Sequence, residues 1–173
     1  MITPDWVRLM AAYNSEMNRR LYAAADTLTD ARRTEDRGAF FKSVHGTLSH
    51  LLWGDRTWLH RFDGTPKPEG GIPTSTTLFP DWAALNDART ATDAAIEDWA
   101  NRVTPAWLNG ATTWFSGAMG RDMSKPNWVL ATHFFNHQTH HRGQAHALLT
   151  GFGLKTRDTD LPFILDLGGL GLA

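Results

Sequence analysis

Hydrophobic residues recur every three or four positions in four long stretches of this chain, with polar residues between them. This spacing places the hydrophobic side chains on one face of an α-helix. It predicts helices over residues 4–27, 39–62, 81–102 and 126–153, the last of them ending at a glycine, either Gly151 or Gly153. Four long amphipathic helices in a chain of 173 residues predict an all-α fold, a four-helix bundle.

The segments between these helices lose the helical period. Residues 30–38 are charged and are expected to form a connection, whereas residues 63–80, rich in glycine and proline, predict a long loop of the kind that often borders a site. Residues 112–116 and 120–123 predict a short hairpin inserted between the third and fourth helices. One further helical turn is expected within residues 158–165.

Composition narrows the class of protein. At 173 residues the chain is expected to form a single domain, residues 1–173, with a substantial core. Its net charge of -1 gives no electrostatic reason to expect a nucleic acid as partner. We also expect no membrane helix and no signal peptide, and hence a cytoplasmic protein. The absence of cysteine excludes disulfides, thiolate ligands and a cysteine nucleophile from these residues.

Five of the eight histidines fall close together in the last predicted helix: His133, His137, His140, His141 and His146. On a helical wheel, His137 and His141 lie within the hydrophobic stripe, His133 and His140 lie on its flank, and His146 points away. Burying two imidazoles without partners costs about 1–3 kcal/mol each. A shared metal ion would satisfy both rings, because two histidines four residues apart on one helix face can bind the same ion.

A third ligand is expected from the second predicted helix, where the candidates are His45, His50, Asp55 and His60. Asp55 falls at the centre of the hydrophobic stripe of that helix, whereas His50 lies more than a right angle away from it. Small residues nevertheless border His50 and would leave room for an ion beside it, namely Gly46, Thr47 and Gly54. Periodicity alone does not decide between His50 and Asp55. A buried Asp55 needs a partner, so we expect it to form a structural ion pair or a hydrogen bond to another helix, with a general base as the alternative.

These motifs resemble those of the DinB family, the DNA-damage-inducible family of small bacterial four-helix-bundle proteins. The resemblance extends over the whole chain, and its most specific parts are residues 49–58 (SHLLWGDRTW) and 136–144 (NHQTHHRGQ), with residues 13–18 and 159–162 in support. The resemblance implies a divalent metal ion bound by His50, His137 and His141. It also implies a homodimer.

Three protein ligands leave at least one coordination position for water or substrate, as in catalytic sites. Neutral imidazoles do not compensate the charge of the ion, which would therefore acidify a bound thiol or water. The resemblance implies a metal-dependent transferase that uses an external low-molecular-weight thiol on a small-molecule substrate. The alternatives are a metal-dependent hydrolase and a non-catalytic metal-binding module of a stress response. Zn, Ni and Fe are the metals we expect for such a ligand set.

Several neighbours of the expected ligands have open roles. His133 and His140 are expected to form hydrogen bonds at the rim of the site or to orient a ligand. Gln144 could reach a metal-bound water or simply be solvated. The anchors we suggest for a substrate are Arg56, Arg142 and residues 64–73, and Trp53 or Trp58 could form a wall of the pocket.

Overall fold

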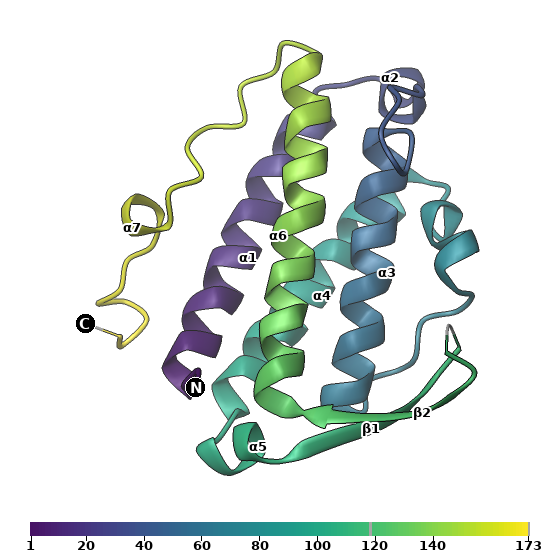
Figure 1. The fold of residues 1–173 in the computed structure, drawn as a ribbon. Helices are drawn as coiled ribbons and strands as arrows, with labels where there is room; N and C mark the ends of the chain where they lie inside the picture. The colour runs from purple at the N-terminus through teal and green to yellow at the C-terminus, as the bar shows by residue number, and fades with distance from the viewer. Residues whose placement is uncertain (118, 173) are drawn as a thin grey trace.

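Over the residues that the computed structural model describes, 1–117 and 119–172, the chain is mostly helical, with a small two-stranded sheet (Figure 1). The long helices are α1 (Pro4–Asp26), α3 (Val44–Asp63), α4 (Trp82–Arg102) and α6 (Asn127–Gly151). The shorter elements are α2 (Asp30–Thr34), the 3-10 helix η1 (Ile72–Thr77), α5 (Pro105–Asn109), β1 (Ala111–Ser116), β2 (Arg121–Pro126) and α7 (Leu161–Ile164). None of the described helices is both long enough and apolar enough to cross a membrane.

Capping side chains determine where three of the long helices begin. Thr3 accepts a hydrogen bond from a backbone N–H in the first turn of α1, and Ser43 and Asp81 do the same for α3 and α4. Each cap satisfies one of the backbone donors that a helix leaves unpaired at its start. At the other end of α3, Gly64 has a φ of 70°, the left-handed conformation that glycine adopts at little cost.

The second predicted helix, 39–62, starts five residues later than expected, because residues 39–43 form a tight turn instead. Ala39 and Lys42 pair as an isolated β-bridge, and Lys42 has a φ of 66°. A helix cannot pass through that conformation, so α3 begins only after the Ser43 cap. Phe41, which the periodicity places on the helix, therefore lies outside it.

The connections hold more structure than the sequence pattern predicts. The charged connection contains the short helix α2, the long loop contains η1, and α5 precedes the hairpin. The hairpin itself is confirmed, since β1 and β2 pair antiparallel with Trp114 opposite Met123. One turn of helix, α7, lies within residues 158–165 as predicted.

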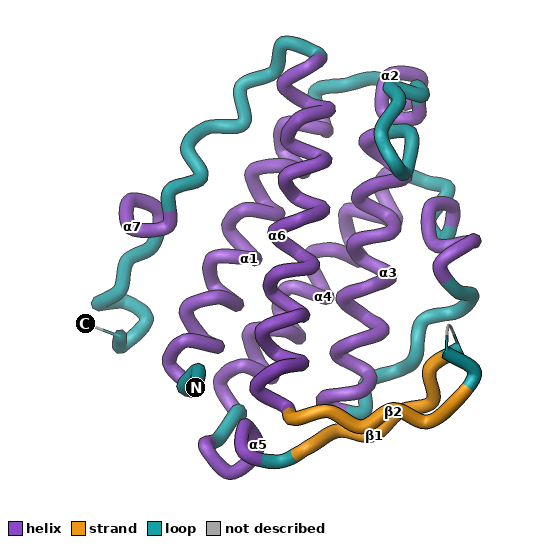
Figure 2. Tube along the Cα trace, in the orientation of Figure 1, coloured by secondary structure: helices purple, strands orange, loops and turns teal. Residues whose placement is uncertain are grey.

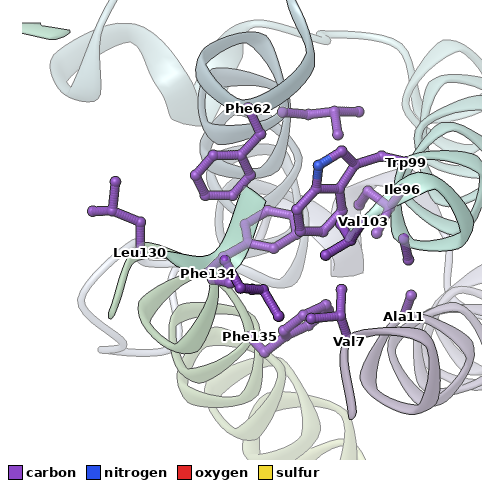
Figure 3. Close-up of a cluster of buried hydrophobic side chains, with 13 residues drawn as sticks. Val7, Ala11, Phe62, Ile96, Trp99, Val103, Leu130, Phe134 and Phe135 are labelled. Atoms are coloured by element: carbon purple, nitrogen blue, oxygen red, sulfur yellow. The ribbon is translucent and has the colours of Figure 1, made fainter. Parts of the chain in front are cut away.

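The long helices surround a common interior in which α1 and α3 each pack against both α4 and α6 (Figure 2). One hydrophobic cluster fills the end where α3 and α4 finish and α6 begins, around Phe62, Trp99, Phe134 and Phe135 (Figure 3). A second cluster fills the opposite end, around Leu21, Leu48, Leu85 and Leu149. Both bury large apolar side chains and so supply the main drive for folding.

Between the two clusters lies a layer of buried charged and amide side chains. Arg89 of α4 donates to Asp55 of α3 and to Asp93 of its own helix, both at 2.6 Å. Asn14 and Asn18 of α1 donate to the same oxygen of Asp93 at 3.1 and 2.9 Å. All five residues are at most 7 % exposed, so the layer is an ion-pair network within the core.

We predict that Arg89→Met lowers the free energy of unfolding by about 3–5 kcal/mol, because it leaves two buried carboxylates without their cation. Denaturant unfolding at pH 7 measures the loss. Arg102→Met is the matched control, since Arg102 pairs with Asp63 and Asp98 on the surface and its removal should leave the unfolding midpoint close to that of the wild type. An Arg89→Met protein as stable as this control would contradict the prediction.

Candidate metal centre

Three histidines from two helices meet beside the polar layer. Each of His50 of α3 and His137 and His141 of α6 offers a ring nitrogen, and these nitrogens all lie within 4.8 Å of one another. The Nε2 atoms of His137 and His141 are 3.1 Å apart, and the rings of His50 and His141 lie 4.8 Å apart, centre to centre. Among the described residues, no carboxylate joins this group. Asp55 instead forms a buried ion pair with Arg89, one of the two structural roles that we expected for it.

Hydrogen bonds select one tautomer for His50. The hydroxyl of Ser75, in η1, donates its single proton to the carbonyl of Ile72 at 2.7 Å. At 2.8 Å from His50 Nδ1, the same oxygen must therefore accept a proton from the ring. This arrangement leaves Nε2 of His50 unprotonated in the neutral ring, with its lone pair available to a metal ion.

His141 is oriented in the same way by its own helix. Its Nδ1 lies 2.8 Å from Oε1 of Gln144, while the amide nitrogen of Gln144 lies 3.2 Å from Nε2 of His140. Because an amide oxygen only accepts, Nδ1 of His141 carries the proton and Nε2 is free. Gln144 therefore positions a ring of the cluster, and the exposed His140 supports Gln144 in turn.

The ring of His137 occupies the space that Gly54 leaves open on α3. A Cβ atom built on Gly54 would lie 2.7 Å from Cε1 of His137, closer than real contacts allow. The small residues that we expected to make room for an ion beside His50 thus include one that makes room for a second imidazole. Nδ1 of His137 is buried and has no hydrogen-bond partner among the described residues, so the contact of its ring with a neighbouring nitrogen runs through Nε2, 3.1 Å from Nε2 of His141.

Burial keeps these histidines neutral. Desolvation, reinforced by the neighbouring imidazoles, lowers the pKa of His50 to about 4 and that of His137 to about 3, and burial also lowers the pKa of His141. Phe41 contributes to this burial, because its ring stacks on His50 with 3.9 Å between centroids. At neutral pH all three imidazoles are in the unprotonated form that binds metal, and the cluster could hold a metal ion.

The remaining candidates lie at the edges or elsewhere. His133 is exposed and packs edge-on against Trp58, which in turn contacts Trp114 of the hairpin. Trp53 lies 5.9 Å from the ring of His50. Arg142 points toward α1, where it donates to Asn14.

The other suggested anchors lie away from the cluster. Arg56 borders a cavity on the α4 side of α3, together with part of residues 64–73. His45 and His60 bond to backbone carbonyls of the loop that follows α3. Ser75, Phe41 and the close approach at Gly54 were not anticipated, and each depends on tertiary contacts that carry no signal in the local sequence pattern.

Comparison with known proteins finds a matching family and a similar solved structure. The sequence model of the DinB family matches residues 1–168. A similar fold occurs in the crystal structure of a DinB-like protein from Bacillus cereus ATCC 10987, with a TM-score of 0.59 and 19% sequence identity. That match covers 87% of this chain and 94% of the other. No curated protein matches the chain.

We predict that the metal-free protein loses stability as the pH falls from about 6.5 toward 4, and that His50→Asn flattens this dependence. The unfolded chain protonates His50 near its ordinary pKa of 6.5, whereas the folded chain does so only at about 4, so acid favours unfolding in this window. Asp93, whose pKa burial raises to about 6, acts in the opposite direction, and comparing wild type with variant cancels its contribution. Urea unfolding in the presence of a chelator at several pH values gives the slope of the free energy of unfolding against pH for the wild type and for His50→Asn. Equal slopes would contradict the lowered pKa of His50.

Proposed function

The chain belongs to the DinB family, and from this premise we propose that it binds one divalent transition-metal ion through His50, His137 and His141. The observation that carries the proposal is the convergence of three ring nitrogens within 4.8 Å of one another. It is supported by the tautomers of His50 and His141, which turn both lone pairs away from their hydrogen-bond partners. Zn, Ni and Fe are the metals that we propose for this ligand set.

We further propose that the chain is a metal-dependent transferase that uses a small external thiol. When bound, an ion held by three neutral imidazoles retains its charge and an open coordination position, and so lowers the pKa of a thiol or a water. The thiol must come from outside, since these 173 residues contain no cysteine. The residues of the chain hold the lone pairs in place, with Ser75 and Gln144 orienting two rings and Phe41 stacking on His50.

A metal-dependent hydrolase remains the second candidate, and the side chains around the histidine cluster make it the less favoured one. Metal-dependent hydrolysis on a pair of helical histidines uses a carboxylate nearby as general base. Within the part of the chain that the structure describes, no carboxylate joins the histidine group, and Asp55 is engaged by Arg89. A thiol with a lowered pKa needs no such base. A purely structural site is also less favoured, because structural zinc sites have four protein ligands rather than three.

We predict that the untagged protein contains about one equivalent of a transition metal and that His137→Ala loses it, since three ligands fall to two. Inductively coupled plasma mass spectrometry measures the content after gel filtration. His146→Ala is the matched control, because His146 lies on the same helix but bonds to Thr156 and should leave the metal content unchanged. Wild-type protein that neither contains metal nor takes it up on titration would overturn the proposal.

Gly54→Ala adds a test of geometry that keeps every ligand. Alanine is a better helix former than glycine by about 1 kcal/mol, so if the substitution acted only on the backbone of α3 it would stabilise that helix. Its Cβ would however displace the ring of His137, so we expect metal affinity to fall although the protein stays folded. Unchanged affinity in Gly54→Ala would show that His137 does not bind the ion from its present position.

The thiol proposal predicts a spectroscopic response in protein loaded with Co(II). Addition of 2-mercaptoethanol should add the intense absorption that a sulfur donor gives to cobalt, while ethylene glycol, the matched alcohol, should not. His137→Ala should lose the response together with the metal. If the cobalt-loaded protein responds to neither compound but cleaves simple esters, the hydrolase is the better description, and the metal proposal stands.

A further inference from the structure

The cavity at Arg56 lies on the other side of α3 from the histidine cluster, and none of the three histidines lines it. It has a volume of about 570 Å³, which falls in the range of small-molecule sites. Its walls are α3, α4 and the two ends of the 64–80 loop, and most of them are apolar, including Leu59, Leu78, Phe79 and Ala95.

Arg56 supplies the cation of this cavity. Its Nε donates to Thr92 at 3.0 Å, and its guanidinium carbon lies 5.4 Å from the centre of the Phe79 ring. These contacts fix the plane of the side chain while Nη1 and Nη2 make no hydrogen bond to any described residue. No carboxylate of the described residues pairs with it within 4.0 Å. Burial and the charge of nearby Arg89 lower the pKa of Arg56, so the cation is short of compensating negative charge.

The loop that forms the outer wall is held in place by α3. His60 bonds to the carbonyl of Thr65 at 2.5 Å, next to the stiff segment that contains Pro66 and Pro68. His45 bonds to the carbonyl of Phe79, also at 2.5 Å. Both ends of the loop are therefore fixed, so that less loop ordering has to accompany binding, which lowers its entropic cost.

We propose that this cavity binds a small molecule with an apolar body and a single carboxylate, which pairs with Arg56. A guanidinium with both Nη atoms free matches the two oxygens of a carboxylate. The other charged side chains at the cavity, Lys67 and Glu69, are exposed and have opposite charges. The net charge of the lining is therefore the single positive charge of Arg56, which one carboxylate on the ligand neutralises. The apolar walls select the rest of the ligand.

The test uses 2-naphthylacetate and its neutral counterpart 2-naphthylacetamide, with affinities measured by calorimetry and the site located by amide chemical shifts. The wild type should bind the carboxylate at least about tenfold more tightly than the amide. Arg56→Gln should abolish this preference and leave the affinity for the amide unchanged. Arg61→Gln is the matched control, because Arg61 is also half-buried on α3 and lies over Trp58, outside the cavity.

Ala95→Leu provides a second variant that keeps every charge. Ala95 lines the cavity from α4, so a larger side chain there should lower the affinity for the carboxylate and for the amide alike. The proposal is overturned if the wild type binds neither compound, binds both equally, or shows its shifts away from residues 65–69 and 78–79. It is also overturned if Arg56→Gln retains the preference for the carboxylate. None of these outcomes depends on whether the histidine cluster binds metal.

Discussion

The buried network around Asp55, Arg89 and Asp93 is the constraint on which the arrangement of the helices depends. Taking a charge out of water costs several kcal/mol unless it is paired and hydrogen-bonded. Hydrophobic clusters tolerate small shifts of one helix past another, but a carboxylate 2.6 Å from a guanidinium does not. The network therefore fixes the register of α3 against α4, and through Asn14 and Asn18 it fixes α1 as well.

The same network extends to α6 and so to the histidine cluster. Arg142 follows His141 directly in the sequence and bonds to Asn14, which in turn bonds to Asp93. Two carboxylates and two guanidinium groups thus balance within the core, and this chain of contacts links α6 to α4 and α1. Because Asp55 holds α3 to the same network, the separation of His50 from His141 is set by ion pairs that are not part of the histidine group.

The sequence pattern predicted most of this fold but only part of the site. Helical periodicity and capping residues located the long helices within a few residues, and the spacing of His137 and His141 showed that both face inward. The wheel gave no decision for His50 because α3 is buried around most of its circumference, against α6, α4 and η1, so one hydrophobic stripe does not describe it. Asp55 could be interpreted as an ion-pair residue, yet its partner Arg89 lies 34 positions away and depends on helix register.

The contacts that position the histidine cluster come partly from segments without helical periodicity, which the sequence pattern could not place. His50 is held by Ser75 and covered by Phe41, one from the loop after α3 and the other from the turn before it. A loop that packs against a helix must pair the backbone carbonyls that face it, and here His45, Ser49 and His60 of α3 provide the donors for Phe79, Ser75 and Thr65. Polar residues of α3 that look unremarkable in sequence thus anchor the loop. Through Ser75 on one side and Phe79 on the other, this single loop completes both the histidine cluster and the cavity at Arg56.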